Sequence, residues 1–292
     1  MPEVQDIQWF PGHMARTRRQ IQASLKLVDA VAEIIDARIP LSSRNPELPS
    51  LTGNKPRIVL LNKCDAADKA VTTKWIAYYR QQGITALAVD CRSGSGLGAF
   101  VPEVKKLLSD KIAKNKEKGM ANRTLRLMVV GIPNAGKSSF INRMSRTVKA
   151  KVEDRPGVTR GNQWFTVAGG IELLDTPGVL WPKFDNKIVG ERLAFTGAIR
   201  DNILDVESLA VRFIETLDPK YVPMLTERYK LPDITGVSPY DVLKLIAKKR
   251  GMLISGGEAD TERAAVMLLD EFRAAKLGRI SLESPERNDI DG

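Results

Sequence analysis

The sequence is poor in the residues that crosslink a chain or bind metal ions. Its 292 residues include two cysteines, Cys64 and Cys91, and a single histidine, His13. Two thiols and one imidazole give no disulfide framework and no zinc-binding spacing. These shortages exclude small disulfide-stabilised domains and zinc-finger proteins, and they predict a protein of the reducing cytoplasm.

Long apolar runs are missing as well. No stretch approaches the roughly 20 apolar residues that a membrane-spanning helix needs, and the N-terminal stretch MPEVQDIQWF lacks the composition of a signal or transit peptide. We therefore expect a cytoplasmic monomer with no membrane partner. The content of 43% apolar and 27% charged residues is typical of a globular protein with a buried core.

Acidic residues are fewer than basic ones. The chain carries 45 Lys and Arg against 35 Asp and Glu, which gives a net charge of +10. This excess favours a polyanionic partner such as a nucleic acid, although ordinary solubility charge would look the same.

The first half of the chain alternates short apolar, β-branched runs with helical patterns, which predicts an α/β domain with a mostly parallel sheet. Strands are expected at residues 30–36, 57–62, 86–91, 125–131 and 170–176. Residues 163–175 are typical of a hairpin with a two-residue Gly169-Gly170 turn. The lysine-rich segment 109–124 fits either a solvated helix end or a linker.

Strand signals fade after residue 205. Helical periodicity appears at 241–251 and again at 260–278, where Asp260 is placed to cap the start and Gly278 to end the helix. We therefore predict a domain at 1–205, with an N-terminal arm at 1–20. A smaller all-α domain at 206–284 and a polar tail at 285–292 would follow.

The segment GIPNAGKS (131–138) fits the phosphate-binding pattern G-x-x-x-x-G-K-S and follows an expected strand. Gly131 and Gly136 allow backbone N–H groups to curl around phosphates. Lys137 would reach the β- and γ-phosphates, and the Ser138 hydroxyl would ligate Mg²⁺. The expected nucleotide contacts here are Asn134, Ala135, Gly136, Lys137, Ser138 and Ser139.

Two further segments complete the phosphate side. In LLDTPG (173–178), Asp175 is placed to hold Mg²⁺ through water, and the Gly178 N–H can bond the γ-phosphate. Thr159, in RPGVTRG (155–161), lies where a mobile loop would bring a threonine to Mg²⁺ and the γ-phosphate, although a plain Pro-Gly turn fits the same letters.

The segment NKCD (62–65) selects guanine over adenine. The Asp65 carboxylate can accept hydrogen bonds from guanine N1–H and N2–H₂, a donor pair that adenine lacks. Asn62 would join this loop to the phosphate loop, and Lys63 would cover the base. The three motifs together predict GTP as substrate and GDP as product.

The motifs stand in an unusual order, because NKCD precedes the phosphate loop. A circular permutation explains this order, and the join of the old termini falls in the lysine-rich segment 109–124. The chain resembles the circularly permuted ribosome-assembly GTPases, specifically the ribosome biogenesis GTPase A group. Besides the motifs above, the resemblance rests on WFPGHM (9–14), DARIP (36–40), PGVT (156–159) and the C-terminal segments GGEADTERAA and FRAAKLGRISLE.

This resemblance implies GTP hydrolysis coupled to late maturation of the large (50S) ribosomal subunit. The factor would bind the precursor particle, with its rRNA and ribosomal proteins, in the GTP state and leave on hydrolysis. Alternatives are a nucleotide-gated RNA-binding module with negligible turnover, or a permuted GTPase of the small subunit or a mitochondrial ribosome. One departure concerns guanine support: the usual Ser-Ala-Lys reads Asp90-Cys91-Arg92, where a backbone N–H would still contact the base oxygen.

The water that attacks GTP lacks its usual partner. Many GTPases place glutamine after D-x-x-G, whereas this chain has the apolar Val179. His13 is the alternative base, joining Lys137 and Thr159 as expected catalytic residues, unless it serves only in packing or RNA contact. Asn134 resembles the asparagine of K⁺-activated GTPases, in which K⁺ offsets charge in the transition state. The alternative is a polar residue with no specific role at a position that tolerates many residues.

Basic residues gather on the last two expected helices and their ends. They can neutralise RNA phosphates, although a solvated basic face would look the same. The candidate RNA contacts are Lys244, Lys248, Lys249, Arg250, Arg263, Arg273, Lys276 and Arg279.

Overall fold

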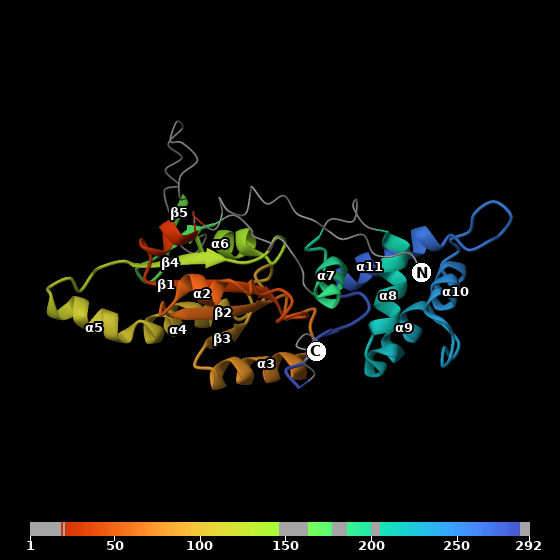
Figure 1. Ribbon diagram of the computed structural model, residues 1–292, viewed down its shortest axis with the longest axis horizontal. Coiled ribbons are helices and arrows are strands. Elements are labelled where there is room, and N and C mark those ends of the chain that lie inside the picture. Colours follow the sequence, from red (N-terminus) through yellow and green to blue (C-terminus); the bar gives the residue numbers. More distant parts are fainter. Residues whose placement is uncertain (1–18, 20, 146–162, 177–185, 200–204, 287–292) are drawn as a thin grey trace, which may run out of the picture.

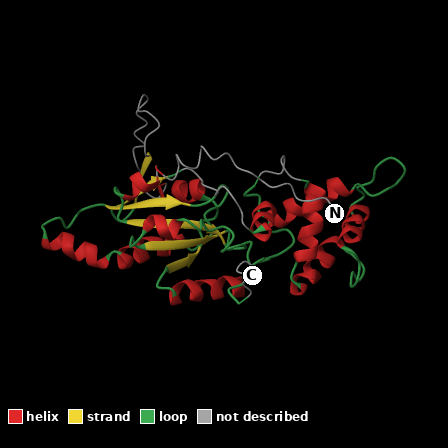
Figure 2. Ribbon diagram, viewed as in Figure 1, coloured by secondary structure: helices red, strands yellow, loops and turns green. Residues whose placement is uncertain are grey.

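The structure is a computed structural model, and it describes residues 19, 21–145, 163–176, 186–199 and 205–286. Figure 1 shows a lobe built around a β-sheet lying beside a second lobe, and Figure 2 shows that the second lobe contains helices alone. The predicted succession of an α/β part and an all-α part is therefore confirmed.

The sheet has six strands in the order β3-β2-β1-β4-β6-β5, and only β5 runs antiparallel to its neighbour. All seven residues of β1 are buried, as in a parallel sheet covered on both faces. The strands are β1 (Ala30–Asp36), β2 (Arg57–Asn62), β3 (Thr85–Ala88), β4 (Leu125–Val130), β5 (Gln163–Val167) and β6 (Ile171–Asp175).

Helices cover both faces of this sheet. On one face α3 buries Trp75 and Tyr79 against β1 and β2, and on the other Phe100 of α4 meets Phe140 of α6 with ring centroids 5.0 Å apart. The first lobe is thus a three-layer α/β/α sandwich. Its helices are α2 (Leu48–Thr52), α3 (Lys69–Gln81), η1 (Leu97–Ala99), α4 (Phe100–Leu107), α5 (Ser109–Glu117) and α6 (Lys137–Ser145).

The direction of the chain changes between β1 and β4. From β1 the chain moves outward to β2 and β3. From β4 it moves the other way, to β5 at the opposite edge and then back to β6 beside β4. Loops that leave two such strands part in opposite directions and open a crevice at their carboxyl ends, where ligands of open α/β sheets bind. The loops after β4, β6 and β2 are those that carry the predicted nucleotide motifs.

In the second lobe α8 packs against α7, α10 and α11. Three phenylalanines pack together at its centre, with ring centroids 5.5 Å apart for the edge-to-face pair Phe195–Phe213 and 4.7 Å for the tilted pair Phe213–Phe272. No helix of the described ranges is both long and apolar enough to cross a bilayer. The helices are α7 (Lys187–Phe195), α8 (Val206–Thr216), η3 (Pro219–Tyr221), α9 (Val222–Tyr229), α10 (Pro239–Lys249) and α11 (Thr261–Arg273).

Several predicted boundaries were wrong. The strand expected at 86–91 covers Thr85–Ala88, and the hairpin loop has three residues, because Val167 pairs with Ile171. The lysine-rich segment 109–124 is partly helical, as α5, and partly a loop. Asp260 caps α11 as predicted, but the helix ends at Arg273, well before Gly278.

The chain beyond α11 explains this early end, because it returns to the first lobe. Backbone N–H groups of Ile280 and Leu282 donate to the carbonyls of Ala66 (3.1 Å) and Arg38 (2.8 Å). The Trp75 indole donates to the carbonyl of Glu283 at 3.2 Å. The end of the predicted helical domain therefore binds the sheet lobe, and α7, expected within 1–205, packs against α8 and α11.

Candidate nucleotide-binding site

The phosphate loop follows β4 and leads directly into α6, so the positive end of that helix faces the loop. Gly136 has φ +104°, and a Cβ there would lie 2.1 Å from Asn62 Nδ2. At Gly131 a Cβ would meet the Ile34 carbonyl oxygen at 2.4 Å. A side chain at either motif glycine would therefore clash with a neighbouring segment of the chain. Glycine at both positions gives the loop the close turns that let backbone N–H groups surround phosphates.

Lys137 is buried at the start of α6, where its Nζ donates to the carbonyls of Gly131 (3.0 Å) and Ile132 (3.1 Å). Burial lowers the pKa of Lys137, and the charge of Asp175 partly offsets this effect. Burial likewise raises the pKa of Asp175, against the opposing charge of Lys137. The two groups thus lie near enough for each charge to affect the other, without forming an ion pair in the described structure.

Two of the three residues expected to hold Mg²⁺, Ser138 and Asp175, have suitable oxygen atoms and lie at or after the ends of neighbouring strands. Ser138 is exposed in the first turn of α6, and Asp175 ends β6, the strand next to β4. Hydroxyl and carboxylate oxygens are ligands that Mg²⁺ accepts. The buried Thr176 hydroxyl donates to the Val129 carbonyl at 2.6 Å and thereby fixes the end of β6 to β4.

Asn62 joins the guanine loop to the phosphate loop. Its Nδ2 donates to the Ala135 carbonyl at 2.6 Å, and its Oδ1 accepts from the Cys91 N–H at 2.9 Å. All three residues are buried. One side chain at the end of β2 therefore positions three loops of the crevice.

In the guanine loop, Lys63 adopts φ +59°, an uncommon conformation for a residue with a side chain. Its Nζ lies 3.0 Å from Asp36 Oδ2, at the end of β1. Asp65 is exposed, so its carboxylate is open to a ligand from the crevice.

The loop after β3 carries Asp90, Cys91 and Arg92, the residues expected to support guanine. The N–H of Cys91 is bound to Asn62, and the N–H groups of Arg92 and Ser93 donate to the Asp90 carboxylate at 2.8 and 3.2 Å. The backbone donors expected to contact the base oxygen are thus engaged with side chains in this arrangement. Burial raises the pKa of Cys91 to about 12, so its thiol stays protonated.

Asn134 is exposed in the phosphate loop and adopts φ +58°. Its Nδ2 donates to the Gly197 carbonyl, just beyond α7, at 2.7 Å. The amide oxygen, which a K⁺ ion would need, accepts no hydrogen bond from the part of the chain that the structure describes. Three expected site residues, His13, Thr159 and Gly178, lie outside the described residues.

The candidate RNA contacts separate into two groups. Lys248, Lys249 and Arg263 are exposed where α10 ends and α11 begins. Lys276 and Arg279 are exposed beyond the other end of α11. Ten helical residues of α11 separate the two groups, a length of about 15 Å. Arg279 is near enough to the guanine loop that its charge lowers the pKa of Cys64, against the larger opposing effect of burial.

The remaining basic candidates have other partners. Arg273 points inward and donates to the carbonyls of Phe195 (3.1 Å) and Ala194 (2.9 Å). Arg250 lies over the Tyr229 ring, and Lys244 pairs with Asp241 at 3.3 Å.

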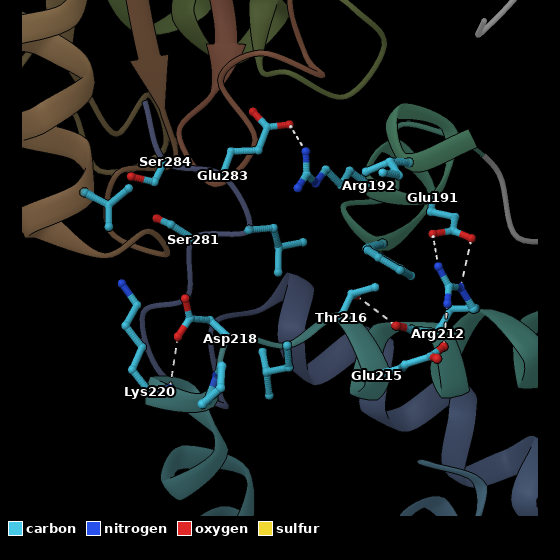
Figure 3. Close-up of a pocket in the computed structure, with 16 residues that line it drawn as sticks. Glu191, Arg192, Arg212, Glu215, Thr216, Asp218, Lys220, Ser281, Glu283 and Ser284 are labelled. Carbon is cyan, nitrogen blue, oxygen red and sulfur yellow. Dashed lines mark hydrogen bonds and ion pairs between the residues drawn. The ribbon is translucent and has the colours of Figure 1, made fainter. Parts of the chain in front are cut away.

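A separate cavity of about 410 Å³ lies between the lobes, and its lining includes none of the nucleotide motifs. Figure 3 shows its charged walls paired: Arg192 Nη1 with Glu283 at 3.4 Å and Arg212 Nε with Glu191 at 3.0 Å. Because these charged side chains already pair with one another, they offer a ligand few unpaired charges. We therefore interpret the cavity as a gap in the packing between the two lobes.

Asp36 and Arg38 are residues that motif reasoning left without a role. They belong to DARIP, and both are buried beside the guanine loop. In the sequence, the two residues stand out only as charged residues at the end of an apolar strand. That pattern predicts a functional site but does not indicate which groups the residues contact.

Comparison with known proteins agrees with this geometry. Residues 126–220 match the family model described as 50S ribosome-binding GTPase. A protein of Priestia megaterium named Ribosome biogenesis GTPase A is 48% identical over 283 residues, which cover 96% of this chain and 97% of that protein. Mitochondrial ribosome-associated GTPase 1 of Mus musculus is 33% identical and covers 94% of this chain and 89% of its own.

Among solved structures, GNP-bound YlqF from T. maritima superimposes with a TM-score of 0.64. The two sequences are 28% identical, over 93% of this chain and 99% of that one. The α/β GTPase fold inferred from the motifs is therefore confirmed.

Proposed function

The chain belongs to the ribosome biogenesis GTPase A family, and from this premise we propose that it acts in late maturation of the large ribosomal subunit. It is a GTPase. In the proposal, the GTP-bound form binds rRNA and neighbouring ribosomal proteins of the 50S precursor, and hydrolysis releases it. In the same proposal, the protein would act in the cytoplasm and as a monomer.

The observation that carries the nucleotide-binding part of this proposal is the double hydrogen bond of Asn62. Because its side chain binds Ala135 of the phosphate loop and Cys91 beside the guanine loop, base and phosphates would be recognised by one connected site. A site that only held a phosphate group would need no such link to a base-selective Asp65.

Each phosphate-side residue has a proposed task. Ser138, Thr159 and Asp175 would hold Mg²⁺, which supplies positive charge to the β- and γ-phosphates when bound. Lys137 would leave the loop carbonyls it now contacts and donate to those phosphates. The Gly178 N–H would bind the γ-phosphate, and His13 would orient the attacking water.

K⁺ would use the Asn134 amide oxygen, because the amide nitrogen is already held by Gly197. A cation at that position would offset charge that develops during phosphoryl transfer.

RNA binding is assigned to two places on the helical lobe. The first is the exposed group Lys248, Lys249 and Arg263, and the second is Lys276 with Arg279, beside the guanine loop. Two basic groups near opposite ends of α11 can contact separate phosphates of a folded RNA.

Turnover measurements test the enzymatic part. GTP hydrolysis should rise when purified large subunits are added, should be faster in K⁺ than in Na⁺, and should collapse in His13→Ala while GDP affinity holds. If the mutant keeps its stimulated rate, His13 is not the water-orienting group. If particles bind in the GTP state without accelerating hydrolysis, the protein is instead a nucleotide-gated RNA-binding module.

Salt dependence tests the RNA part. Each lost phosphate contact should flatten the plot of log affinity against log salt by about 0.7–0.9. Lys248→Ala/Lys249→Ala should therefore weaken rRNA binding and flatten this plot. The charge-matched control Lys69→Ala/Arg80→Ala, with both residues exposed on α3, should change neither. Equal effects of the two double variants would refute the assignment.

A further inference from the structure

Two motifs that the proposed function leaves without a task bind each other. The loop after β1 carries DARIP (36–40), and the segment after α11 carries GRISLE (278–283). Glu283 accepts hydrogen bonds from the N–H groups of Leu41 (2.5 Å) and Ser42 (3.1 Å). The C-terminal segment, blue in Figure 1, runs from α11 back towards the sheet lobe, where the Leu282 N–H donates to the Arg38 carbonyl of this loop.

Asp36 lies at the guanine end of this contact. Its Oδ2 lies 3.0 Å from Lys63 Nζ and 2.7 Å from Arg38 Nη2, while its Oδ1 accepts from Arg38 Nε at 2.9 Å. The Arg38 fork therefore fixes the carboxylate that in turn holds Lys63. Burial alone would raise the pKa of Asp36, but the charges of Arg38 and Lys63 hold it well below its usual range.

Arg38 also touches the helical lobe. Its side chain is 1% exposed, and its guanidinium carbon lies 5.0 Å from the centroid of the Phe272 ring in α11. Its remaining nitrogen, Nη1, lies 3.5 Å from the carbonyls of Phe272 and Arg273, at the negative end of that helix. A single buried guanidinium thus bridges the guanine loop and the end of α11.

The phosphate loop reaches the same point by another route. Asn134 donates to the Gly197 carbonyl, and a Cβ at Gly197 would lie 3.3 Å from Arg273 Nε. Arg273 in turn donates to the carbonyls at the end of α7. The backbone of Arg273 faces Arg38 while its side chain supports the segment that Asn134 binds.

We propose that Arg38 is a positioning residue for Lys63 of the guanine loop, and that it transmits guanine nucleotide binding to the end of α11. The proposal rests on the proposed function, because it assumes that Lys63 lies against the bound base. Its consequence is that nucleotide occupancy and the position of the helical lobe are coupled through one side chain.

Three variants of the full-length protein separate this role from simple stability. Arg38→Met removes the guanidinium, and Arg38→Lys keeps the charge without the fork. The matched control is Arg44→Met. Arg44 also forms a buried ion pair with a carboxylate of β1, at 3.2 Å from Glu33, but it contacts neither Lys63 nor α11 among the described residues.

Two readouts apply to each variant: the dissociation constant for GDP, and the protection from amide hydrogen exchange that GDP confers on residues 193–199 and 270–283. We expect Arg38→Met to raise the dissociation constant about tenfold, equivalent to about 1.4 kcal/mol, and to abolish the protection. Arg38→Lys should give the same changes to a smaller extent. Arg44→Met should keep GDP affinity within about twofold of wild type, with the protection intact.

Unchanged GDP affinity in both Arg38 variants, or protection that persists in both, would overturn the proposal. So would losses in Arg44→Met that equal those in Arg38→Met, because the effect would then be general destabilisation. A wild type that binds ADP as tightly as GDP would refute the guanine site and this proposal together. If wild type prefers GDP to ADP but both Arg38 variants behave like wild type, the guanine site stands and only the proposed role of Arg38 is refuted.

Discussion

Replacing Asn62 with alanine should damage folding stability and nucleotide binding together. The substitution removes the donor to Ala135 and the acceptor from Cys91, whose partner atoms lie 2.6 and 2.9 Å away. Ala135 is 1% exposed and Cys91 is 2% exposed, so water does not reach the abandoned carbonyl and N–H without rearrangement of the loops.

The expected size follows from those two orphaned groups. A buried polar group that loses its partner costs about 1–3 kcal/mol. Partial relaxation of two loops around a small cavity lowers the sum, so we expect the free energy of unfolding to fall by about 2–4 kcal/mol. GDP affinity should fall at least about tenfold, because the guanine and phosphate loops would no longer be held in register.

Urea denaturation without nucleotide, followed by GDP titration, measures both effects. Asn62→Asp keeps an acceptor for Cys91 but faces the Ala135 carbonyl with a second oxygen, so it should also weaken GDP binding. Asn115→Ala is the control, because Asn115 is buried on α5 and its side chain forms no hydrogen bond within the described ranges. If Asn62→Ala stays within about 0.5 kcal/mol and twofold of wild type, the loops hold their positions without this residue and the reasoning is wrong.

Three further outcomes follow from the site. Asp175→Asn should stabilise the nucleotide-free protein at pH 7 while weakening Mg²⁺–GTP binding. Burial raises the folded-state pKa of Asp175, so the ionised carboxylate lowers the free energy of unfolding at neutral pH. As the pH falls towards the ordinary pKa of 3.8 the carboxylate becomes protonated, and the stability difference between Asp175→Asn and wild type should disappear. Urea denaturation at a series of pH values measures this difference. Gly136→Ala should abolish GDP binding in a titration, because its Cβ would lie 2.1 Å from Asn62 Nδ2 and φ is +104°. Cys91, with a pKa of about 12, should resist iodoacetamide at pH 8 until urea unfolds the chain, as peptide mass spectrometry would show.

Local patterns were enough to predict the sheet and the nucleotide motifs. Most of the strands are short apolar runs, and the phosphate loop and NKCD are contiguous segments that can be identified from adjacent residues. The same holds for the start of α11, where the Asp260 side chain accepts from the Arg263 N–H at 3.0 Å. A helix cap depends on residues that are adjacent in the sequence, and it can therefore be predicted.

Contacts between distant segments left no such pattern. The end of α11 at Arg273, with Ala275 at φ +56°, follows from the return of the chain to Ala66 and Arg38. The sequence suggested an exposed basic face that includes Arg273, whereas packing turns that side chain inward to the end of α7. Charge alone predicts neither outcome, because both depend on which element lies opposite.

The permuted order divides the site into two consecutive halves, and this division gives the helical lobe its place. The strands β1 to β3 provide the guanine loop, and β4 to β6 provide the phosphate loops. The helical lobe meets both halves at Arg273: the Arg273 carbonyl lies 3.5 Å from Arg38 Nη1, and the Arg273 side chain lies beside Gly197, whose carbonyl accepts from Asn134. In the proposed site, a guanine nucleotide would also contact both halves at once. A shift of one half relative to the other on binding therefore acts on Arg273 from two sides, and the end of α11 is where we expect the helical lobe to respond.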